Sequence, residues 1–361
     1  MRVLVTGGAG FIGTRVVAAL LTAGHEVKVL DALLPSVHSG PPDLPPDVEF
    51  VEGDIRDDDV LRSALRGVDA VSHHAAMVGR GREIRDVADF SSCNDLGTAK
   101  LIVAMTEAGV DRLIHASSVA VYGEGRYRCA EHGRVRPGRR LVADLEAGSF
   151  EPRCPECHQA ELTAEPIEET DFVAPVYSVY AGTKATQEHL VAAWATETRC
   201  SAVALRYFCV YGPDMPFDSP YTGVAGIFRS DVIAGRSPRV YEDGCSLRDY
   251  IHVTDVAAAN VAALGRDDPG FRTYNVSGGR PHTVHEVATT LSTEVGGPSP
   301  IVTGEFRAAD ARHVFGSPAR LMRELNWRPT VDFASGMREF AVAPMRERAT
   351  PPGGLPAPSR F

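Results

Sequence analysis

The sequence predicts an α/β protein built on a doubly wound parallel sheet, with a smaller C-terminal lobe and an inserted excursion resembling a zinc ribbon. Three observations predict this fold. Short apolar segments alternate with helix-like segments through the first half, a glycine-rich motif follows the first apolar segment directly, and paired Cys and His residues lie in a stretch without apolar periodicity. A chain of 361 residues suits two coupled domains, or one domain with a large lobe.

Strand-like segments recur at short intervals along the first half of the chain. Each is apolar, short and followed by a helical pattern, which is the rhythm of a parallel sheet with crossover helices. The expected strands lie within residues 2–6, 25–31, 47–54, 69–76 and 112–118, and the first expected helix spans 11–23. Regular patterning is lost from residue 123 to about 171 and resumes at 176.

Composition excludes several classes of protein. The formal net charge of -10 disfavours a general nucleic-acid binder. The sequence has no run of about 18 apolar residues, so we expect no membrane span, and it starts on a strand rather than on a signal peptide. We therefore expect a cytoplasmic protein, in which the seven cysteines bind metal or are simply buried rather than forming disulfides.

The glycine-rich motif GGAGFIG predicts a dinucleotide site. Gly7 permits a tight turn, Gly10 lets a diphosphate approach the backbone, and Gly13 lets the following helix pack on the sheet. The second expected strand ends on Asp31, whose carboxylate can bind both ribose hydroxyls and would repel a 2′-phosphate. The cofactor is therefore expected to be NAD rather than NADP.

Later strand ends are expected to complete the cofactor site. Asp54 and Ile55 close the third strand, where an acid can reach the adenine amino group, and Ala75 and Ala76 are small enough to let the cofactor pass. Asp54 has a second interpretation, compatible with the first, as the cap of the helix that follows.

A candidate catalytic set is spread over two motifs. YAGTK places Tyr180 and Lys184 on one face of a helix, where the ammonium and a positive nicotinamide ring should lower the tyrosine pKa. Such a pair also occurs on ordinary surface helices. The strand end ASSVAVYG favours the catalytic interpretation, because Ser118 can hydrogen-bond a substrate oxygen and share its proton with Tyr180.

These motifs resemble the extended short-chain dehydrogenase/reductase family, in its group of nucleotide-sugar epimerases and dehydratases. Further matches are HHAA, NDLGT, RYFCVYGP, EDGCSLRDYIHVTDVA, YNVSGG and LNWRP. The resemblance implies catalytic roles for Ser118, Tyr180 and Lys184, and a homodimer that uses the helix of Tyr180. It implies cofactor contacts from Phe11, Ile12, Asn94 and Phe208 besides the residues above. It implies substrate contacts from Val78, Ser117, Ser118, Cys209, Arg248 and Asp310, with the Arg248 guanidinium on the nucleotide diphosphate.

The chain departs from the family pattern at three places. Val119 and Ala120 stand where family dehydratases carry an Asp-Glu pair, so elimination of water lacks its proton carriers. Cys209 replaces the usual Asn of RYFN, which puts one substrate contact in doubt. The third departure is an insertion between Ser118 and Tyr180.

The insertion predicts a structural zinc. Cys129 and His132, together with Cys154 and Cys157, form two knuckles that suit a tetrahedral site, and His158 competes as the fourth ligand. A metal would stabilise a small excursion that lacks its own core. The alternatives to a structural zinc are a loop with ordinary cysteines and a catalytic metal that binds a water in place of one ligand. Zinc insertions of this kind, with the segment SPYTGVAGIF, resemble dTDP-L-rhamnose 4-epimerase-like proteins, which implies sugar-nucleotide contacts from Tyr221 and Thr222.

These expectations combine into a domain plan and a function. Residues 1–204 form an NAD-binding Rossmann domain that carries the insertion 124–171 and returns at about 247–276, residues 205–246 and 277–345 form a substrate-binding lobe, and 346–361 form a disordered tail. The expected reaction is epimerisation at carbon-4 of a dTDP-linked 6-deoxyhexose through a 4-keto sugar. The alternatives are an NAD(P)H-dependent 4-ketoreductase and a non-catalytic NAD sensor in which the zinc ribbon docks a partner.

Overall fold

A parallel sheet of seven strands forms the centre of the protein in the computed structural model, which describes residues 1–35, 37–79, 84–171, 178–217 and 223–346. All of its neighbouring strands run parallel, which confirms the predicted doubly wound sheet. In spatial order the strands are β13 (Gly270–Val276), β9 (Ser201–Tyr207), β5 (Arg112–Ser118), β4 (Ala70–His73), β1 (Arg2–Thr6), β2 (Glu26–Asp31) and β3 (Glu49–Glu52).

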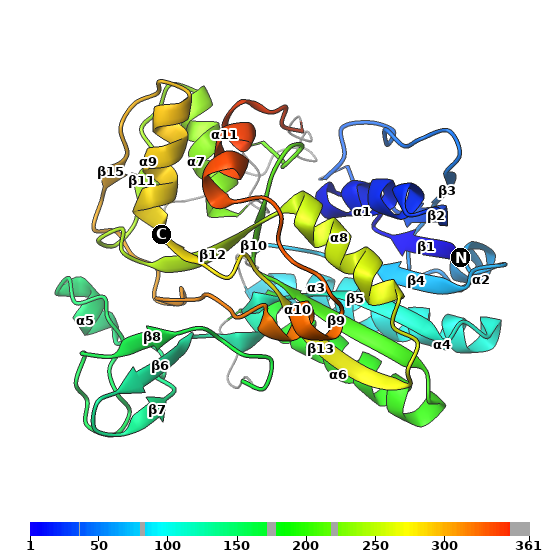
Figure 1. The fold of residues 1–361 in the computed structure, drawn as a ribbon, viewed down its shortest axis with the longest axis horizontal. Helices are drawn as coiled ribbons and strands as arrows, with labels where there is room; N and C mark the ends of the chain where they lie inside the picture. The colour runs from blue at the N-terminus through cyan, green and yellow to red at the C-terminus, as the bar shows by residue number, and fades with distance from the viewer. Residues whose placement is uncertain (36, 80–83, 172–177, 218–222, 347–361) are drawn as a thin grey trace.

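Helices cover both faces of this sheet, as Figure 1 shows. On one face α1 (Phe11–Thr22) packs against α8 (Val253–Leu264), and their apolar residues share a core with α10 (Ala319–Glu324). The other face buries a second core beneath α2 (Asp58–Ala64), α4 (Gly97–Ala108) and α6 (Val179–Thr198). Two short segments, α3 (Val87–Phe90) and the π-helical turn η2 (Ser91–Leu96), lead into α4. Burial on both faces explains why these strands read as continuous apolar runs.

The C-terminal lobe is built around a third apolar core, which includes Tyr211, Phe228 and Phe340. Two small sheets order its strands as β10 (Cys209–Tyr211), β12 (Leu247–His252), β14 (Pro281–Thr283), and as β11 (Arg239–Val240), β15 (Ile301–Val302). Its helices are α7 (Val224–Ile233), α9 (Val284–Glu294) and α11 (Phe333–Val342). Figure 1 shows this lobe beside the carboxyl ends of the central strands.

The insertion forms a compact antiparallel unit. The 3₁₀ turn η3 (Val119–Tyr122) leads from β5 into β6 (Arg126–Cys129), which is the middle strand between β7 (Gly133–Val135) and β8 (Thr163–Glu165). A short helix, α5 (Val142–Glu146), lies between β7 and β8 in the sequence. In Figure 1 the unit projects below the C-terminal lobe. Its own apolar cluster is small, and three of the paired cysteines belong to it.

The last described residue, Arg346, corrects the expectation that a disordered tail begins there. Its guanidinium donates to the carbonyls of Ala9 and Gly10, at 2.6 and 3.2 Å, and to the Thr14 hydroxyl at 2.9 Å. Its N–H donates to the Met215 carbonyl, so the segment ties the C-terminal lobe to the glycine-rich turn. The rest of the expected tail lies outside the described residues. Among the described helices, none is long and apolar enough to cross a membrane.

Candidate active site

The glycine-rich turn between β1 and α1 has the geometry that close approach of a dinucleotide requires. Gly7 adopts φ +69°, and a Cβ there would lie 2.6 Å from the Ala75 nitrogen. A Cβ on Gly13 would lie 2.2 Å from the Gly7 carbonyl oxygen, so the helix could not pack so near the turn. Gly10 is the N-cap of α1, and Phe11 and Ile12 begin the helix beside it. The N–H groups of this first turn suit a bound diphosphate.

Asp31 lies at the end of β2, next to this turn. Its carboxylate accepts from the N–H groups of Ala9 and Leu33, both at 3.0 Å, and faces His38 Nε2 at 3.5 Å. The ribose of a bound cofactor would be expected beside a carboxylate in this position, next to the glycine-rich turn.

Asp54 and Ile55 follow β3, but Asp54 does not cap the helix. Its two carboxylate oxygens pair with the Arg56 guanidinium, at 2.9 and 2.6 Å, and one also accepts from the Arg56 N–H. Asp57 caps α2 instead, since it accepts from the N–H groups of Asp59 and Val60. The alternative interpretation of Asp54 as a helix cap is therefore wrong. Burial places the Ile55 side chain in the core.

Asn94 joins the loop after β4 to α6. Its side chain exchanges hydrogen bonds with the N–H and carbonyl of Met77, at 2.7 and 3.0 Å, and donates to the Thr183 hydroxyl at 2.9 Å. The loop that it holds contains Ala75, Ala76 and Val78, the last of which is exposed. Asn94 is fully buried, so it acts on the expected cofactor site through the loop that its hydrogen bonds to Met77 hold in place.

Ser118, Tyr180 and Lys184 meet at the carboxyl end of β5. Ser118 is the last residue of β5, and Tyr180 lies in the first turn of α6, whose N-cap Ser178 accepts from the Ala181 N–H. The Ser118 hydroxyl is hydrogen-bonded to Tyr180. Lys184 Nζ donates to the Ala116 carbonyl at 2.8 Å. The structure thus brings together the three residues of the predicted catalytic set.

The pKa values at this site differ from the sequence expectation. Burial raises the pKa of Tyr180 above its usual value, and the hydrogen bond from Ser118 opposes this rise. The Lys184 ammonium contacts a backbone carbonyl instead of the phenol, so the expected lowering of the Tyr180 pKa by lysine is not seen. Burial also lowers the pKa of Lys184 to about 8.

The structure buries one expected substrate contact, Ser117, and one expected cofactor contact, Phe208. Ser117 is buried and its hydroxyl donates to Glu188 at 2.5 Å, so its assignment to the substrate is wrong. Phe208 packs on Gly316 within an apolar cluster at the base of the insertion, which covers its ring. Cys209 begins β10 and is partly exposed. Tyr221 and Thr222 lie outside the described residues.

Arg248 keeps the donors that a diphosphate needs. Its Nη1 donates to the carbonyls of Leu247 and Arg312, both at 2.8 Å, and its Nη2 donates to the Ala311 carbonyl at 2.6 Å. These bonds use three of the five N–H groups of the guanidinium. The carbonyl of Asp310, another expected contact, accepts from Arg140 of the insertion.

Buried histidines surround Lys184, and the sequence did not predict that they would form a cluster. His73 bridges the hydroxyls of Thr6 and Thr98, at 2.7 and 3.0 Å. The His115 ring lies 5.6 Å from the His73 ring and has no hydrogen-bond partner on either nitrogen among the described residues. Only the pairing of β4 with β5 brings these residues together, so no local sequence signal reveals the cluster.

Cys129, His132, Cys154 and Cys157 form a cluster whose ligand atoms lie within 4.8 Å of one another. The Cys129 sulfur lies 3.6 Å from His132 Nδ1 and 3.7 Å from the Cys157 sulfur, and Cys154 Sγ lies 3.8 Å from the same histidine nitrogen. Bond lengths to zinc imply tetrahedral edges of about 3.8 Å for S···S and about 3.6 Å for S···N. The four residues therefore fit zinc. All seven cysteines are described, and none forms a disulfide.

Known proteins resemble the whole chain. The NAD dependent epimerase/dehydratase family matches residues 3–139 and 154–277. The dTDP-L-rhamnose 4-epimerase of Burkholderia thailandensis is 32% identical, over 94% of this chain and 93% of that protein. Two solved UDP-glucose 4-epimerases share the fold. The enzyme from Thermus thermophilus, in complex with NAD, has a TM-score of 0.74 at 33% identity and covers 94% of this chain and 98% of its own. The enzyme from Thermotoga maritima, with UDP-glucose, has a TM-score of 0.77 at 26% identity and covers 94% and 97%.

These matches span both lobes, and they confirm the family resemblance that the motifs indicated. The glycine-rich turn, the acid that ends β2 and the Ser-Tyr-Lys set all lie within the matched residues. The chain belongs to the NAD-dependent epimerase/dehydratase family of enzymes.

Proposed function

We propose that this enzyme is an NAD-dependent nucleotide-sugar 4-epimerase that acts on a dTDP-linked 6-deoxyhexose. The observation that carries the proposal is the meeting of Ser118, Tyr180 and Lys184 at the carboxyl end of β5. The dTDP-L-rhamnose 4-epimerase of Burkholderia thailandensis, 32% identical, supports the choice of sugar. UDP-glucose is the competing substrate, since other relatives at 27–30% identity are UDP-glucose 4-epimerases.

The residues near the glycine-rich turn fit NAD, and each has a role in holding it. Gly7, Gly10 and Gly13 admit the diphosphate to the start of α1, while Asp31 accepts from the ribose hydroxyls. The chemistry that bound NAD supplies is acceptance of a hydride from sugar carbon-4 and its return to the opposite face of that carbon.

Tyr180 moves the proton of the sugar 4-hydroxyl. Its oxygen takes this proton during oxidation, directly or through the Ser118 hydroxyl, and gives it back when the 4-keto sugar is reduced. Because burial favours the neutral phenol, the phenolate depends on positive charge near it. Lys184 lies one helical turn away but donates to the Ala116 carbonyl, so it would supply this charge together with the positive nicotinamide ring of bound NAD.

Dehydration is disfavoured by the residues next to Ser118. Val119 and Ala120, the first two residues of η3, offer neither the acid nor the base that elimination of water requires.

The same proposal includes a structural zinc held by Cys129, His132, Cys154 and Cys157. Their spacing supports it, and His132 is favoured over His158, which does not belong to the cluster. Four protein ligands would leave no open position for catalysis. Elemental analysis of the purified protein tests this assignment, and less than half an equivalent of zinc per chain would refute it.

The test of the reaction uses purified enzyme with no added cofactor. We expect bound NAD, and a 4-epimerised product from a dTDP-6-deoxyhexose at a higher kcat/KM than from UDP-glucose. Epimerisation of UDP-glucose alone would refute the choice of sugar. Net oxidation of NADH or NADPH by a dTDP-4-keto-6-deoxy sugar, without epimerisation, would identify a ketoreductase instead.

A further inference from the structure

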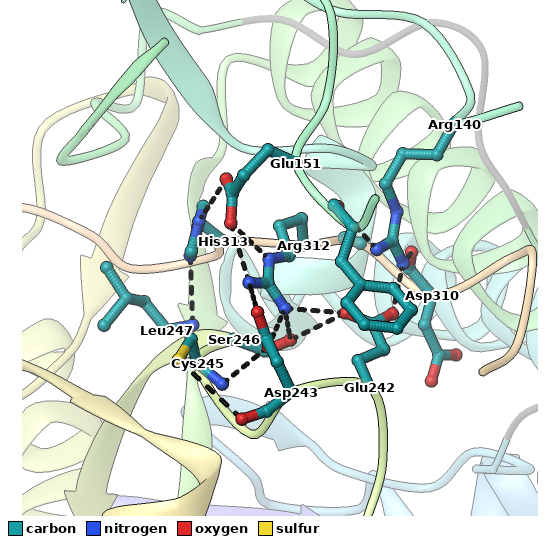
Figure 2. Close-up of polar contacts among 12 residues, drawn as sticks. Arg140, Glu151, Glu242, Asp243, Cys245, Ser246, Leu247, Asp310, Arg312 and His313 are labelled. Atoms are coloured by element: carbon teal, nitrogen blue, oxygen red, sulfur yellow. Dashed lines mark hydrogen bonds and ion pairs between the residues drawn. The ribbon is translucent and has the colours of Figure 1, made fainter. Parts of the chain in front are cut away.

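A buried guanidinium joins the insertion to the C-terminal lobe. Arg312 is 1% exposed and follows β15 in the chain. Its side chain pairs with Glu151 at 2.7 Å, with Glu242 at 2.8 Å and with Asp243 at 2.7 Å. Figure 2 shows these acidic side chains converging on it. Glu151 belongs to the insertion, whereas Glu242 and Asp243 lie between β11 and β12, so three distant segments meet at one cation.

Two further contacts join the same segments. Arg140 of the insertion pairs with Glu242 at 2.7 Å and donates to the carbonyl of Asp310 at 2.7 Å (Figure 2). Glu124, at the start of the insertion, accepts from the backbone N–H of Arg312 at 2.9 Å. The insertion therefore contacts residues 310 and 312 through Arg140, Glu124 and Glu151.

Carboxylates outnumber guanidiniums in this network. Glu124, Glu151, Glu242 and Asp243 surround two arginines, Arg140 and Arg312. A buried cation that loses its last partner is strongly destabilising. Arg312 would keep two carboxylate partners after loss of the Glu151 charge, so a neutral substitution of Glu151 is expected to leave the fold intact.

Glu151 also binds the next residue. One of its oxygens lies 3.0 Å from His313 Nε2, and His313 Nδ1 accepts from the N–H of Leu247 at 3.1 Å (Figure 2). Glu151 thus fixes the side chains of two consecutive residues, one of which reaches the residue preceding Arg248.

The chain that Glu151 fixes is the one that orients Arg248. The Arg248 guanidinium donates to the carbonyls of Ala311 and Arg312, at 2.6 and 2.8 Å, and to its neighbour Leu247. A shift of these carbonyls would move the guanidinium with them. Its two remaining N–H groups would then miss a ligand whose geometry they must match.

We propose that Glu151 is a positioning residue for the nucleotide diphosphate, acting from the insertion through residues 311–313 on Arg248. This inference rests on the proposed function and on the role that the family resemblance implies for Arg248, which is to bind the diphosphate. It gives the insertion a role in substrate binding that is separate from the proton transfer by Tyr180 of α6.

The test compares Glu151→Gln with Glu146→Gln in the full-length enzyme with its bound NAD. Glu146 is an exposed glutamate of α5 and serves as the matched control. We expect Glu151→Gln to weaken binding of both UDP and dTDP about tenfold by calorimetry, because the lost bond involves a charged group. KM for the sugar nucleotide should rise by a similar factor, while kcat, NAD content and melting temperature stay near those of the control.

A second variant guards against a folding defect. His313→Asn keeps an oxygen able to accept from the Leu247 N–H but loses the contact with Glu151, so a smaller loss of nucleotide affinity is expected. Unchanged affinity in both variants would overturn the inference, as would a loss of NAD content parallel to that of nucleotide binding. Wild-type enzyme that binds neither UDP nor dTDP would instead overturn the proposed function.

Discussion

Acidification should destabilise this enzyme through its buried histidines. Burial lowers the pKa of His73 and of His74 to about 3, because a charged imidazole loses its hydration there, and the nearby Lys184 charge adds to the effect. Burial also lowers the pKa of His115 well below its usual value. The folded protein therefore keeps these rings neutral in mild acid, whereas the unfolded chain takes up protons.

The sign and size of the effect follow from linkage. A depressed pKa contributes stability that is present above the unfolded value, about 6.5, and is lost progressively as the pH falls toward the folded value, about 3. One pH unit corresponds to about 1.4 kcal/mol for each histidine. At about pH 5, His73 and His74 together should therefore cost about 4 kcal/mol of unfolding free energy relative to about pH 7.5.

The assay is urea unfolding at these two pH values, for the wild type and for His74→Phe. The aromatic substitution keeps a ring against Tyr207, on which His74 stacks, and should recover about 2 kcal/mol of the acid loss. His115→Phe should recover stability in the same direction. It should also stabilise the protein at neutral pH, since it removes two buried ring nitrogens that have no hydrogen-bond partner among the described residues. His285→Gln, at an exposed position, is the control. An acid loss in His74→Phe equal to that of the wild type would refute the reasoning.

Four other perturbations test the site. Tyr180→Phe should lower kcat by about 10²- to 10⁴-fold with unchanged NAD content, because it removes only the proton carrier; a near-normal kcat would remove Tyr180 from the mechanism. Asp31→Ala should weaken NAD binding and relax discrimination against NADP, measured by competition titration; unchanged selectivity would contradict the ribose assignment. Cys154→Ser should lose zinc and lower the melting temperature, whereas Cys200→Ser, outside the cluster, should do neither. Arg346→Gln should speed the release of NAD during gel filtration, because it frees the glycine-rich turn from the C-terminal lobe; equal retention would show that this contact is dispensable.

The sequence predicted those features whose residues lie close together in the chain. The first strand, the glycine-rich turn and Asp31 follow one another within one βαβ unit, so their spacing alone predicts how they meet. Tyr180 and Lys184 share one helix, and Ser118 ends a recognisable apolar strand. The knuckles of the insertion likewise carry their ligand spacing in the sequence.

The tertiary structure decided the features that depend on partners far along the chain. Ser117 looked like a substrate contact, but it faces Glu188 because alternate residues of β5 point to opposite sides of the sheet. Arg346 looked like part of a tail, and only its docking on the glycine-rich turn gave it a partner.

The sequence by itself therefore determined the family, the cofactor turn, the catalytic helix and the candidate zinc ligands, because each is encoded in residues a few positions apart. Only the tertiary structure decided how Glu151 reaches Arg312, and how the consecutive residues His73 and His74 meet His115 of the neighbouring strand beside Lys184. The residues in these contacts are far apart in the sequence, so no helix or strand spacing predicts that they meet. The packing of whole helices and strands against one another determines these contacts.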